Sequence, residues 1–337
     1  MVRHKNNFDF LRFLFAIFVI ITHSFALSGI SDKKEWLVAF THHQTSFSAI
    51  GLSGFFTISG YFIYVSLMRS PNLKIYFKKR LLRIIPGLLV VLLITLCIIP
   101  LLYTVSEPLL TNTSYFTYLP RNISLYGFQG PIDGVFEKLP YHSINGSLWT
   151  IQYEFSLYVA LIMLYFIKPF KNLQLWCTIS LLVVMIVLYR TNFYNVHNSQ
   201  VFQILGVHVL NLGGFFVAGA VLAQFEFKKW NHLRIVAITA ALILIAFYLG
   251  IYNDVKHVLF PLCIMSLGFI PIKFMQRFSN YGDGSYGIYI YAFPIQQILI
   301  YNFNLDLVEF IIYSIILSII MGYISWHLVE KRALRLK

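Results

Sequence analysis

The chain has 337 residues, of which 58% are hydrophobic and only 12% are charged. A soluble domain carries roughly 25% charged residues, so this composition excludes an ordinary soluble protein and indicates a polytopic membrane protein. The net charge of +13 does not indicate a nucleic-acid partner, because most of the Lys and Arg residues fall in segments that would lie together on the cytoplasmic side. The charge therefore indicates orientation, with both termini in the cytoplasm.

Apolar segments of about 20 residues, the length that crosses a bilayer as a helix, recur along the chain. They predict an all-α bundle of about ten transmembrane helices. We expect a single membrane domain over residues 1–337, with a large outside loop at about 107–147 and no soluble domain before or after the bundle. The predicted spans are 8–27, 47–68, 84–106, 148–168, 172–190, 204–225, 233–252, 255–273, 285–303 and 306–328.

The first span carries three ionisable residues. Arg12 and His23 are eleven residues apart, which is three helical turns plus about 20°, so both side chains lie on one stripe of the helix. Asp9 precedes Arg12 by three residues and is close enough to pair with it. A charge near the centre of a lone span costs about 2.5–3.5 kcal/mol, so such residues usually face a bundle interior or a wet cavity. One alternative is a structural Asp9–Arg12 pair with a hydrogen-bonded His23. Another is a cleaved signal peptide, but Arg12 and the length of the apolar run argue against it.

The second span contains a row of small residues, Gly54, Thr57, Ser59 and Gly60. Small residues let helix backbones approach closely in lipid, which would make this row a packing surface. The alternative is that the row leaves room and hydroxyl groups for a ligand that passes through the bundle.

The inside loop that follows is the most basic stretch of the chain, with Lys78, Lys79, Arg80 and Arg83. Arg80 and Arg83 are three residues apart and would lie on one side of a helical turn. By the positive-inside rule, these residues would keep this segment on the cytoplasmic side of the membrane. Guanidinium and ammonium groups also suit phosphates, so the same residues are candidates for a phosphate clamp.

The outside loop between the third and fourth spans is rich in aromatic residues, including Tyr126 and Phe128. A loop of this length is usually functional or disordered, and its aromatic content argues against disorder. Aromatic faces with polar neighbours suit a sugar, whereas an aromatic belt at the membrane interface would produce the same composition. The sequence leaves both interpretations open.

The loop leads into the fourth span through Ser147 and Trp149, and Glu154 follows. We predict that Ser147 caps this helix, which puts Glu154 about two turns, or about 10 Å, below the outer surface. His23 has a similar predicted depth, so the two side chains are expected to meet. A carboxylate at this depth needs a partner to remain ionised. No metal site is predicted, because adjacent His42 and His43 point apart on most backbones and the cysteines occur at unrelated spacings.

Four motifs, in chain order, resemble those of the membrane acyltransferase-3 family, which includes bacterial surface-polysaccharide O-acetyltransferases. The resemblance covers almost the whole chain. It departs from the family at Ala292, where many members carry a His, so no catalytic role is assigned to that region. The matching residues are Arg12 and His23 in the first span, Phe55, Phe56, Ser59 and Gly60 in the second, Arg80 and Arg83 in the basic loop, and Ser147, Leu148, Trp149 and Glu154 at the fourth.

The resemblance implies transfer of an acyl group, usually acetyl, from cytoplasmic acetyl-CoA to a hydroxyl of a glycan outside the membrane, such as O-antigen or capsule. It implies a multi-pass enzyme of the bacterial cytoplasmic (inner) membrane. The partners would be acyl-CoA, a glycan or lipid-linked oligosaccharide acceptor and the lipid bilayer, with no nucleic acid and no metal.

The matching residues carry the expected roles. His23 would act as general base on the acceptor hydroxyl, and Glu154 would hold its tautomer and stabilise the imidazolium. Arg12 would stabilise donor or oxyanion charge, or only the fold together with Asp9. An acyl-enzyme relay on His23 or Ser59 is the second route. The donor would be bound by Lys78, Lys79, Arg80, Arg83, Ser59 and Gly60, and the acceptor by Trp149, Tyr126 and Phe128.

The competing function is that of a transporter or flippase for a lipid-linked sugar or small molecule. Such a protein would also carry charges inside the membrane, beside interrupted helices. Internal repeats would favour this function, but the first five and the last five predicted spans share no motif.

Overall fold

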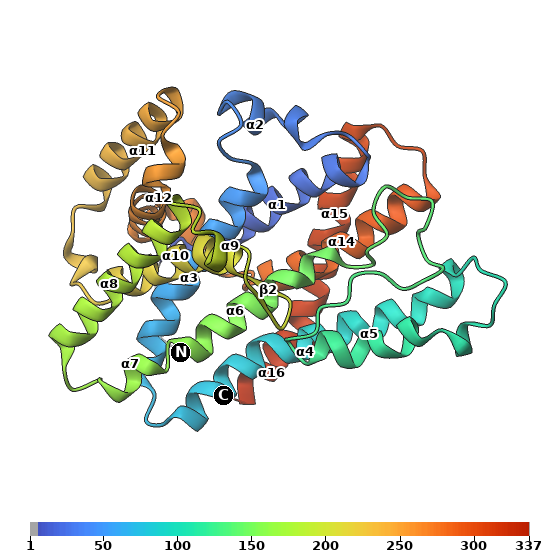
Figure 1. Ribbon diagram of the computed structural model, residues 1–337, viewed down its shortest axis with the longest axis horizontal. Coiled ribbons are helices and arrows are strands. Elements are labelled where there is room, and N and C mark those ends of the chain that lie inside the picture. Colours follow the sequence, from blue (N-terminus) through green and yellow to red (C-terminus); the bar gives the residue numbers. More distant parts are fainter. Residues whose placement is uncertain (1–5, 337) are drawn as a thin grey trace. The chain divides into compact units, whose positions relative to one another are not determined.

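The computed structural model describes residues 6–336 of the chain (Figure 1). Residues 1–5 and 337 lie outside this range. They include both predicted cytoplasmic ends and belong to the predicted 1–337 domain. Between them the chain is almost wholly helical, and its only strands within residues 6–336 are β1 (Gln200–Val201) and β2 (Ile204–Leu205), which pair antiparallel. The predicted all-α class is confirmed.

Six segments within residues 6–336 are helical, long and apolar enough to cross a membrane, which confirms a polytopic membrane protein. The other four predicted spans correspond to α10, α11, α12 and α14, which are 17 or 18 residues long. At 1.5 Å per residue they measure about 26–27 Å, slightly less than the hydrocarbon core of about 30 Å. A count of ten spans therefore stays a prediction. The six segments are Phe8–Leu27, Phe47–Arg69, Leu73–Leu102, Gly146–Phe166, Lys171–Arg190 and Leu307–Leu336.

Most helices follow one another with short connections, and a longer one, residues 124–145, follows α5. Short 3₁₀ turns lie at Asp32–Lys34, Leu109–Thr111, Gly146–Leu148, Phe227–Lys229 and Leu334–Leu336, and a π-helical turn lies at Trp326–Glu330. The α-helices are α1 (Phe8–Leu27), α2 (Trp36–Phe40), α3 (Phe47–Arg69), α4 (Leu73–Leu102), α5 (Thr113–Ile123), α6 (Trp149–Ala160), α7 (Met163–Phe166), α8 (Lys171–Arg190), α9 (Tyr194–His197), α10 (Gly206–Leu222), α11 (His232–Tyr248), α12 (Tyr252–Phe269), α13 (Lys273–Phe278), α14 (Ser285–Asn302), α15 (Leu307–Ser325) and α16 (Lys331–Ala333).

The prediction that the basic residues lie in a loop is wrong. They belong to the first turns of α4, which begins at Leu73, well before the predicted start of the third span. Asn72 starts the helix, because its Oδ1 accepts a hydrogen bond from the backbone N–H of Ile75 at 2.9 Å. Lys and Arg are good helix formers, so charge marks the membrane boundary here without ending the helix.

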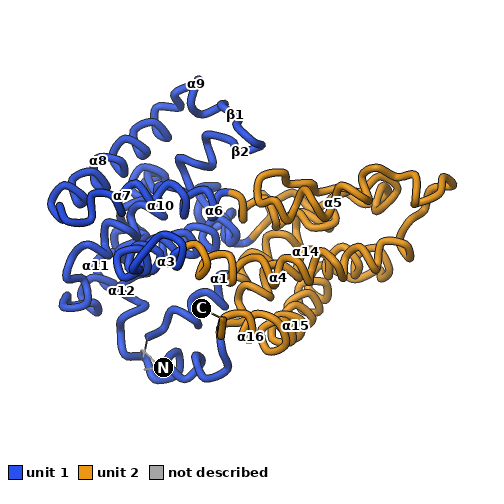
Figure 2. The backbone as a smooth tube through the Cα atoms, turned by 90° about the horizontal axis from the view of Figure 1, so that it is seen from below, with its two compact units in different colours: residues 1–15, 36–76, 153–282 blue, residues 16–35, 77–152, 283–337 orange. Residues whose placement is uncertain are grey.

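The chain forms two compact units (Figure 2). Unit 1 comprises the described part of residues 1–15 together with 36–76 and 153–282, and unit 2 comprises 16–35, 77–152 and the described part of 283–337. Helices α1, α4 and α6 each pass from one unit into the other, so motifs that are close in sequence can fall in different units.

In unit 1, α3 packs closely on α10. A Cβ atom at Gly60 would lie 1.9 Å from the carbonyl oxygen of Phe216, and one at Gly219 would lie 2.1 Å from that of Thr57. No side chain fits at either position, so the two backbones are in direct contact. At Gly60 the small residues of the second span therefore form a packing surface.

The outside segment 107–147 of unit 2 is folded around α5. Tyr118, Ile132 and Val135 form its interior and are at most 1% exposed. Burial raises the pKa of the Tyr118 phenol, which therefore stays protonated. The segment is also fastened to α4: Pro100 has no N–H, so the Leu96 carbonyl loses its helical partner and accepts a hydrogen bond from the Tyr115 hydroxyl at 3.3 Å.

Candidate functional site

The sequence-predicted site residues divide between the two units. His23 and Glu154 lie in different units, so their predicted meeting stays a prediction. Unit 1 holds Asp9, Arg12, Ser59, Gly60 and Glu154, and unit 2 holds His23, Lys78, Lys79, Arg80, Arg83, Tyr126, Phe128 and Trp149.

Arg12 pairs with Asp9 on the first turns of α1, as the spacing predicts. Its Nη1 lies 3.7 Å from Asp9 Oδ1, and its guanidinium carbon lies 5.6 Å from the centre of the Phe62 ring. An opposite charge and an aromatic face both lower the cost of holding a guanidinium in this place. The pair stabilises the start of the helix, and an additional role of Arg12 toward donor or oxyanion charge stays a prediction.

Glu154 receives two hydrogen bonds within unit 1. The Ser59 hydroxyl on α3 donates to Glu154 Oε1 at 2.9 Å, and the Tyr158 hydroxyl donates to the same oxygen. These donors provide the partners that a carboxylate inside a bundle requires. Sequence reasoning assigned Ser59 to the binding of acetyl-CoA, not to Glu154. It missed Tyr158, although Tyr158 lies four residues after Glu154 on the same helix face.

We expect Ser59→Ala and Tyr158→Phe to lower kcat by similar factors of about 10- to 100-fold, since a hydrogen bond to a charged group contributes about 1.5–3 kcal/mol. Steady-state kinetics of both variants, with donor and acceptor varied separately, measures this. Complete loss of transfer in Ser59→Ala beside mild loss in Tyr158→Phe would instead identify Ser59 as the acyl-carrying nucleophile.

His23 has a buried Nδ1 atom with no hydrogen-bond partner among residues 6–336. Its ring packs edge-to-face against Phe293 of α14, with the ring centres 5.2 Å apart and the planes at 77°. A structural histidine normally has its buried nitrogen satisfied, because an unpaired buried polar atom is costly. Nδ1 of His257 is also without a partner among these residues, so this feature fits a catalytic His23 without deciding against the structural alternative.

Two adjacent glutamines of α14 hold the surroundings of His23, and sequence reasoning missed both. Gln296 is fully buried, and its Nε2 donates to the Ile20 carbonyl at 3.0 Å and to the Ser24 hydroxyl at 2.8 Å. Gln297 donates to two carbonyls of the outside segment at 2.7 and 2.6 Å. The turn of α1 that carries His23 is thus fixed to α14 on both sides. The sequence did contain a signal for this contact, because two adjacent amide side chains in an apolar helix indicate buried hydrogen bonds to a neighbouring helix.

The end of the outside segment is fixed to the same helix. Pro294 lacks an N–H, so the carbonyl of Ile290 is released from the helix and accepts a hydrogen bond from Asn145 Nδ2 at 2.8 Å. The prediction that Ser147 caps the fourth span is wrong. Ser147 lies within the 3₁₀ turn Gly146–Leu148, and its buried hydroxyl has no hydrogen-bond partner among residues 6–336.

Arg83 belongs to a partly buried ionic cluster of unit 2. Its Nη2 lies 2.6 Å from Asp283 Oδ2, and its Nη1 lies 3.8 Å from Glu330 Oε2. Glu330 is 1% exposed, lies in the π-helical turn after α15 and accepts a hydrogen bond from the Ser325 hydroxyl at 3.1 Å. Two carboxylates therefore already neutralise Arg83, and a phosphate would compete with them. Sequence reasoning assigned no role to Asp283 or Glu330.

The other predicted donor ligands lie closer to the start of α4. Lys78 is exposed, and Lys79 and Arg80 are half-buried. Positive charge on the first turns of a helix at the membrane boundary is accessible to an anion in the aqueous phase. A phosphate clamp formed by Lys78, Lys79 and Arg80 stays a prediction.

The predicted acceptor residues are half-buried. Phe128 lines a space of only about 10 Å³ together with Leu125 and Leu148. A space of this size admits about one water molecule, so it is too small for a sugar. The acceptor roles of Tyr126, Phe128 and Trp149 stay predictions. Within residues 6–336, no three His, Cys, Asp or Glu side chains are grouped so that they would hold a metal ion.

Comparison with known proteins identifies the family. Residues 5–329 match the acyltransferase domain of the acyltransferase-3 type. The "O-acetyl transferase" of Shigella phage Sf6 is 30% identical over 345 residues, which cover 98% of this chain and 97% of that protein. "Nodulation protein 10" of Rhizobium leguminosarum bv. viciae is 33% identical over 177 residues, or 48% of this chain and 44% of that protein. No solved structure matches. The chain therefore belongs to the acyltransferase-3 family and is a multi-pass membrane acyltransferase.

Proposed function

We propose that the protein transfers an acetyl group from cytoplasmic acetyl-CoA to a hydroxyl of a glycan outside the membrane, such as O-antigen or capsule. Its location would be the bacterial cytoplasmic (inner) membrane. The name of the phage relative supports acetyl as the group and oxygen as the acceptor atom. The observation that carries the proposal is His23, a histidine in an apolar helix whose buried Nδ1 has no hydrogen-bond partner among residues 6–336.

His23 acts as the general base in this proposal. It removes the proton of the acceptor hydroxyl as the oxygen attacks the thioester carbonyl carbon. The new carbon–oxygen bond forms, the carbon–sulfur bond breaks, and the departing thiolate of CoA takes up the proton. Gln296 keeps the turn that carries the imidazole in place through its bonds to Ile20 and Ser24. Glu154, oriented by Ser59 and Tyr158, stabilises the imidazolium.

The test is acetyl transfer by the purified full chain in liposomes. Acetyl-CoA is supplied on one side and surface glycan on the other, and both CoA release and the acetyl content of the glycan are measured by mass spectrometry. We expect glycan-dependent CoA release and a glycan mass increased by whole acetyl groups. Glycan that crosses the membrane unmodified, with no CoA release, would overturn the proposal in favour of transport.

We expect the double variant Lys78→Ala/Lys79→Ala to raise the KM for acetyl-CoA about tenfold and to leave kcat and the KM for glycan nearly unchanged. The reason is that a lost ammonium–phosphate contact removes binding energy shared by ground and transition states. Lys228→Ala/Lys229→Ala removes the same charge from another predicted inside segment and serves as the control. An equal change in both double variants would mean that the lysines contribute only to orientation.

A further inference from the structure

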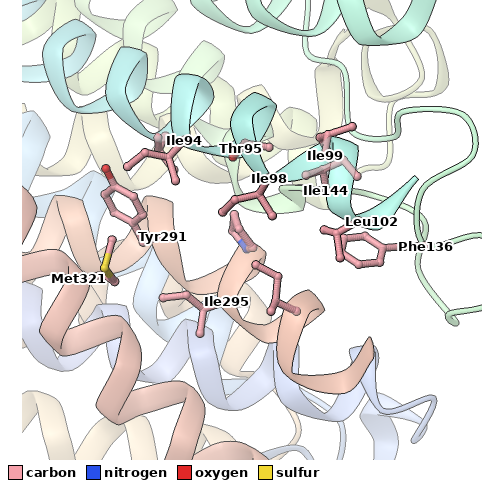
Figure 3. Close-up of a pocket in the computed structure, with 13 residues that line it drawn as sticks. Ile94, Thr95, Ile98, Ile99, Leu102, Phe136, Ile144, Tyr291, Ile295 and Met321 are labelled. Atoms are coloured by element: carbon pink, nitrogen blue, oxygen red, sulfur yellow. The ribbon is translucent and has the colours of Figure 1, made fainter. Parts of the chain in front are cut away.

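Unit 2 contains an apolar cavity of about 200 Å³ between α4, α14 and α15 (Figure 3). Ile98 and Ile295 face each other across it, and Tyr291 and Met321 lie at one end. At the other end, Leu102 lies beside Phe136 of the outside segment (Figure 3). The cavity is part of the membrane-spanning body of the unit and is covered toward the outside by a folded segment.

The chemistry of the lining selects the class of ligand. Among the side chains that line the cavity, only Thr95 and Tyr291 carry a polar atom. A sugar or a nucleotide placed here would leave most of its hydroxyl or phosphate groups without hydrogen bonds, which is costly. A hydrocarbon chain has no such groups, so the lining suits a hydrocarbon.

The cavity reaches the surface that faces lipid. Ile94 lines it and is 36% exposed, and the neighbouring Leu93, also on α4, is 44% exposed. Ile99 and Leu102, farther along the helix, are 1% and 8% exposed. From Ile94 to Leu102 the helix rises about 12 Å, so a chain that enters from the bilayer at Ile94 can extend toward the outer side.

The cavity and the surroundings of His23 share one helix. Phe293 of α14 packs against His23, and the next two residues, Pro294 and Ile295, line the cavity. Ile144 also lines the cavity, and the residue after it, Asn145, holds the end of the outside segment to α14. A chain in the cavity would therefore lie across one helix from the proposed base, with its outer end at the segment that leads into α6.

We propose that this cavity binds the hydrocarbon anchor of a lipid-linked glycan acceptor and so presents the glycan to the catalytic residues. The inference rests on the proposed function. Lipid tails are as apolar as the lining, so binding is selective by shape and packing rather than by the hydrophobic effect. The occupant is a chain attached to a glycan because buried residues of the outside segment, Phe136 and Ile144, line one end of the cavity, and the acceptor is expected at this segment.

The first test measures kinetics after the cavity has been filled by substitution. Ile98→Trp and Ile298→Trp, made in the full chain, each place a bulky side chain in the cavity. The control is Ile320→Trp, which places the same side chain on the lipid-facing side of α15, where Ile320 is 49% exposed. The acceptors are a glycan on a polyprenyl diphosphate and the same glycan without lipid. We expect the two cavity variants to raise the KM for the lipid-linked acceptor about tenfold, with the KM for free glycan and for acetyl-CoA unchanged. Equal KM values for the lipid-linked acceptor in all three variants and the parent would overturn the inference.

A second measurement does not depend on transfer. A polyprenyl diphosphate-linked glycan with a photoreactive group in the chain is irradiated with the protein in vesicles of phosphatidylethanolamine and phosphatidylglycerol, without acetyl-CoA. We expect labelled peptides from α4 and α14, and loss of this label in Ile298→Trp but not in Ile320→Trp. If a photoreactive phospholipid labelled the same peptides at equal strength, the occupant would be bulk lipid, and the inference would be overturned. Labelling without any acetyl transfer would overturn the proposed function alone.

Discussion

Replacement of His23 by Ala is expected to lower acetyl transfer by about 10²- to 10⁴-fold, because a positioned general base contributes about that much. Glu154→Ala should cause a loss of comparable size if the carboxylate stabilises the imidazolium. The double variant should be little worse than the poorer single one, since residues that act as a unit are not additive. Glu154→Gln is the finer probe, because it keeps the shape and most hydrogen bonds but removes the charge.

The measurement is kcat per mole of folded protein, determined by steady-state transfer assays beside acetyl-CoA binding. His257→Ala is a matched control. His257 is buried, and its Nδ1, like that of His23, has no partner among residues 6–336. Its Nε2, however, is 3.1 Å from the Asn211 carbonyl, and its ring packs on Phe215, 4.5 Å between ring centres. We expect this control to lose stability rather than kcat. Near-normal turnover in well-inserted His23→Ala would refute the general base, and multiplicative losses in the double variant would separate His23 from Glu154.

The parts of the fold that follow from local sequence were predictable. The apolar run of the first span gives α1 the predicted bounds, Phe8–Leu27, and the spacing of Asp9 and Arg12 gives their ion pair. Length and hydropathy decide the first feature, and the spacing of three residues on a helix decides the second. The start of α4 was not predictable in the same way, because hydropathy marks where lipid begins and the helix continues into water as far as Leu73.

The partners that define the candidate site depend on which helices pack together, and hydropathy does not report this. Ser59 donates to a carboxylate 95 positions away, and Gln296 donates to the Ser24 hydroxyl 272 positions away. Ser59 and Gln296 both lie in predominantly apolar spans. Paired polar residues in a membrane helix do indicate a buried contact, but one sequence does not say with which helix.

Arg83→Leu is expected to destabilise the protein by about 3–5 kcal/mol, which distinguishes a structural ion cluster from a phosphate ligand. Removal of one partner of a buried ion pair leaves the other charge uncompensated, and here two carboxylates, Asp283 and Glu330, would lose their cation. The measurement is thermal unfolding of the detergent-solubilised chain, with the Tm and the folded fraction compared with the parent.

Two further variants separate the possibilities. Arg83→Leu/Glu330→Leu removes the most buried carboxylate together with the cation, so it should recover much of the lost Tm, because replacing a buried ion pair with apolar residues is often neutral or stabilising. Arg80→Leu, three residues earlier on the same helix, is the control for loss of positive charge at this membrane boundary and should lower the Tm far less. If Arg83→Leu kept its Tm and instead raised the KM for acetyl-CoA, the guanidinium would be a donor ligand, and Asp283 and Glu330 would be its supports in the free enzyme.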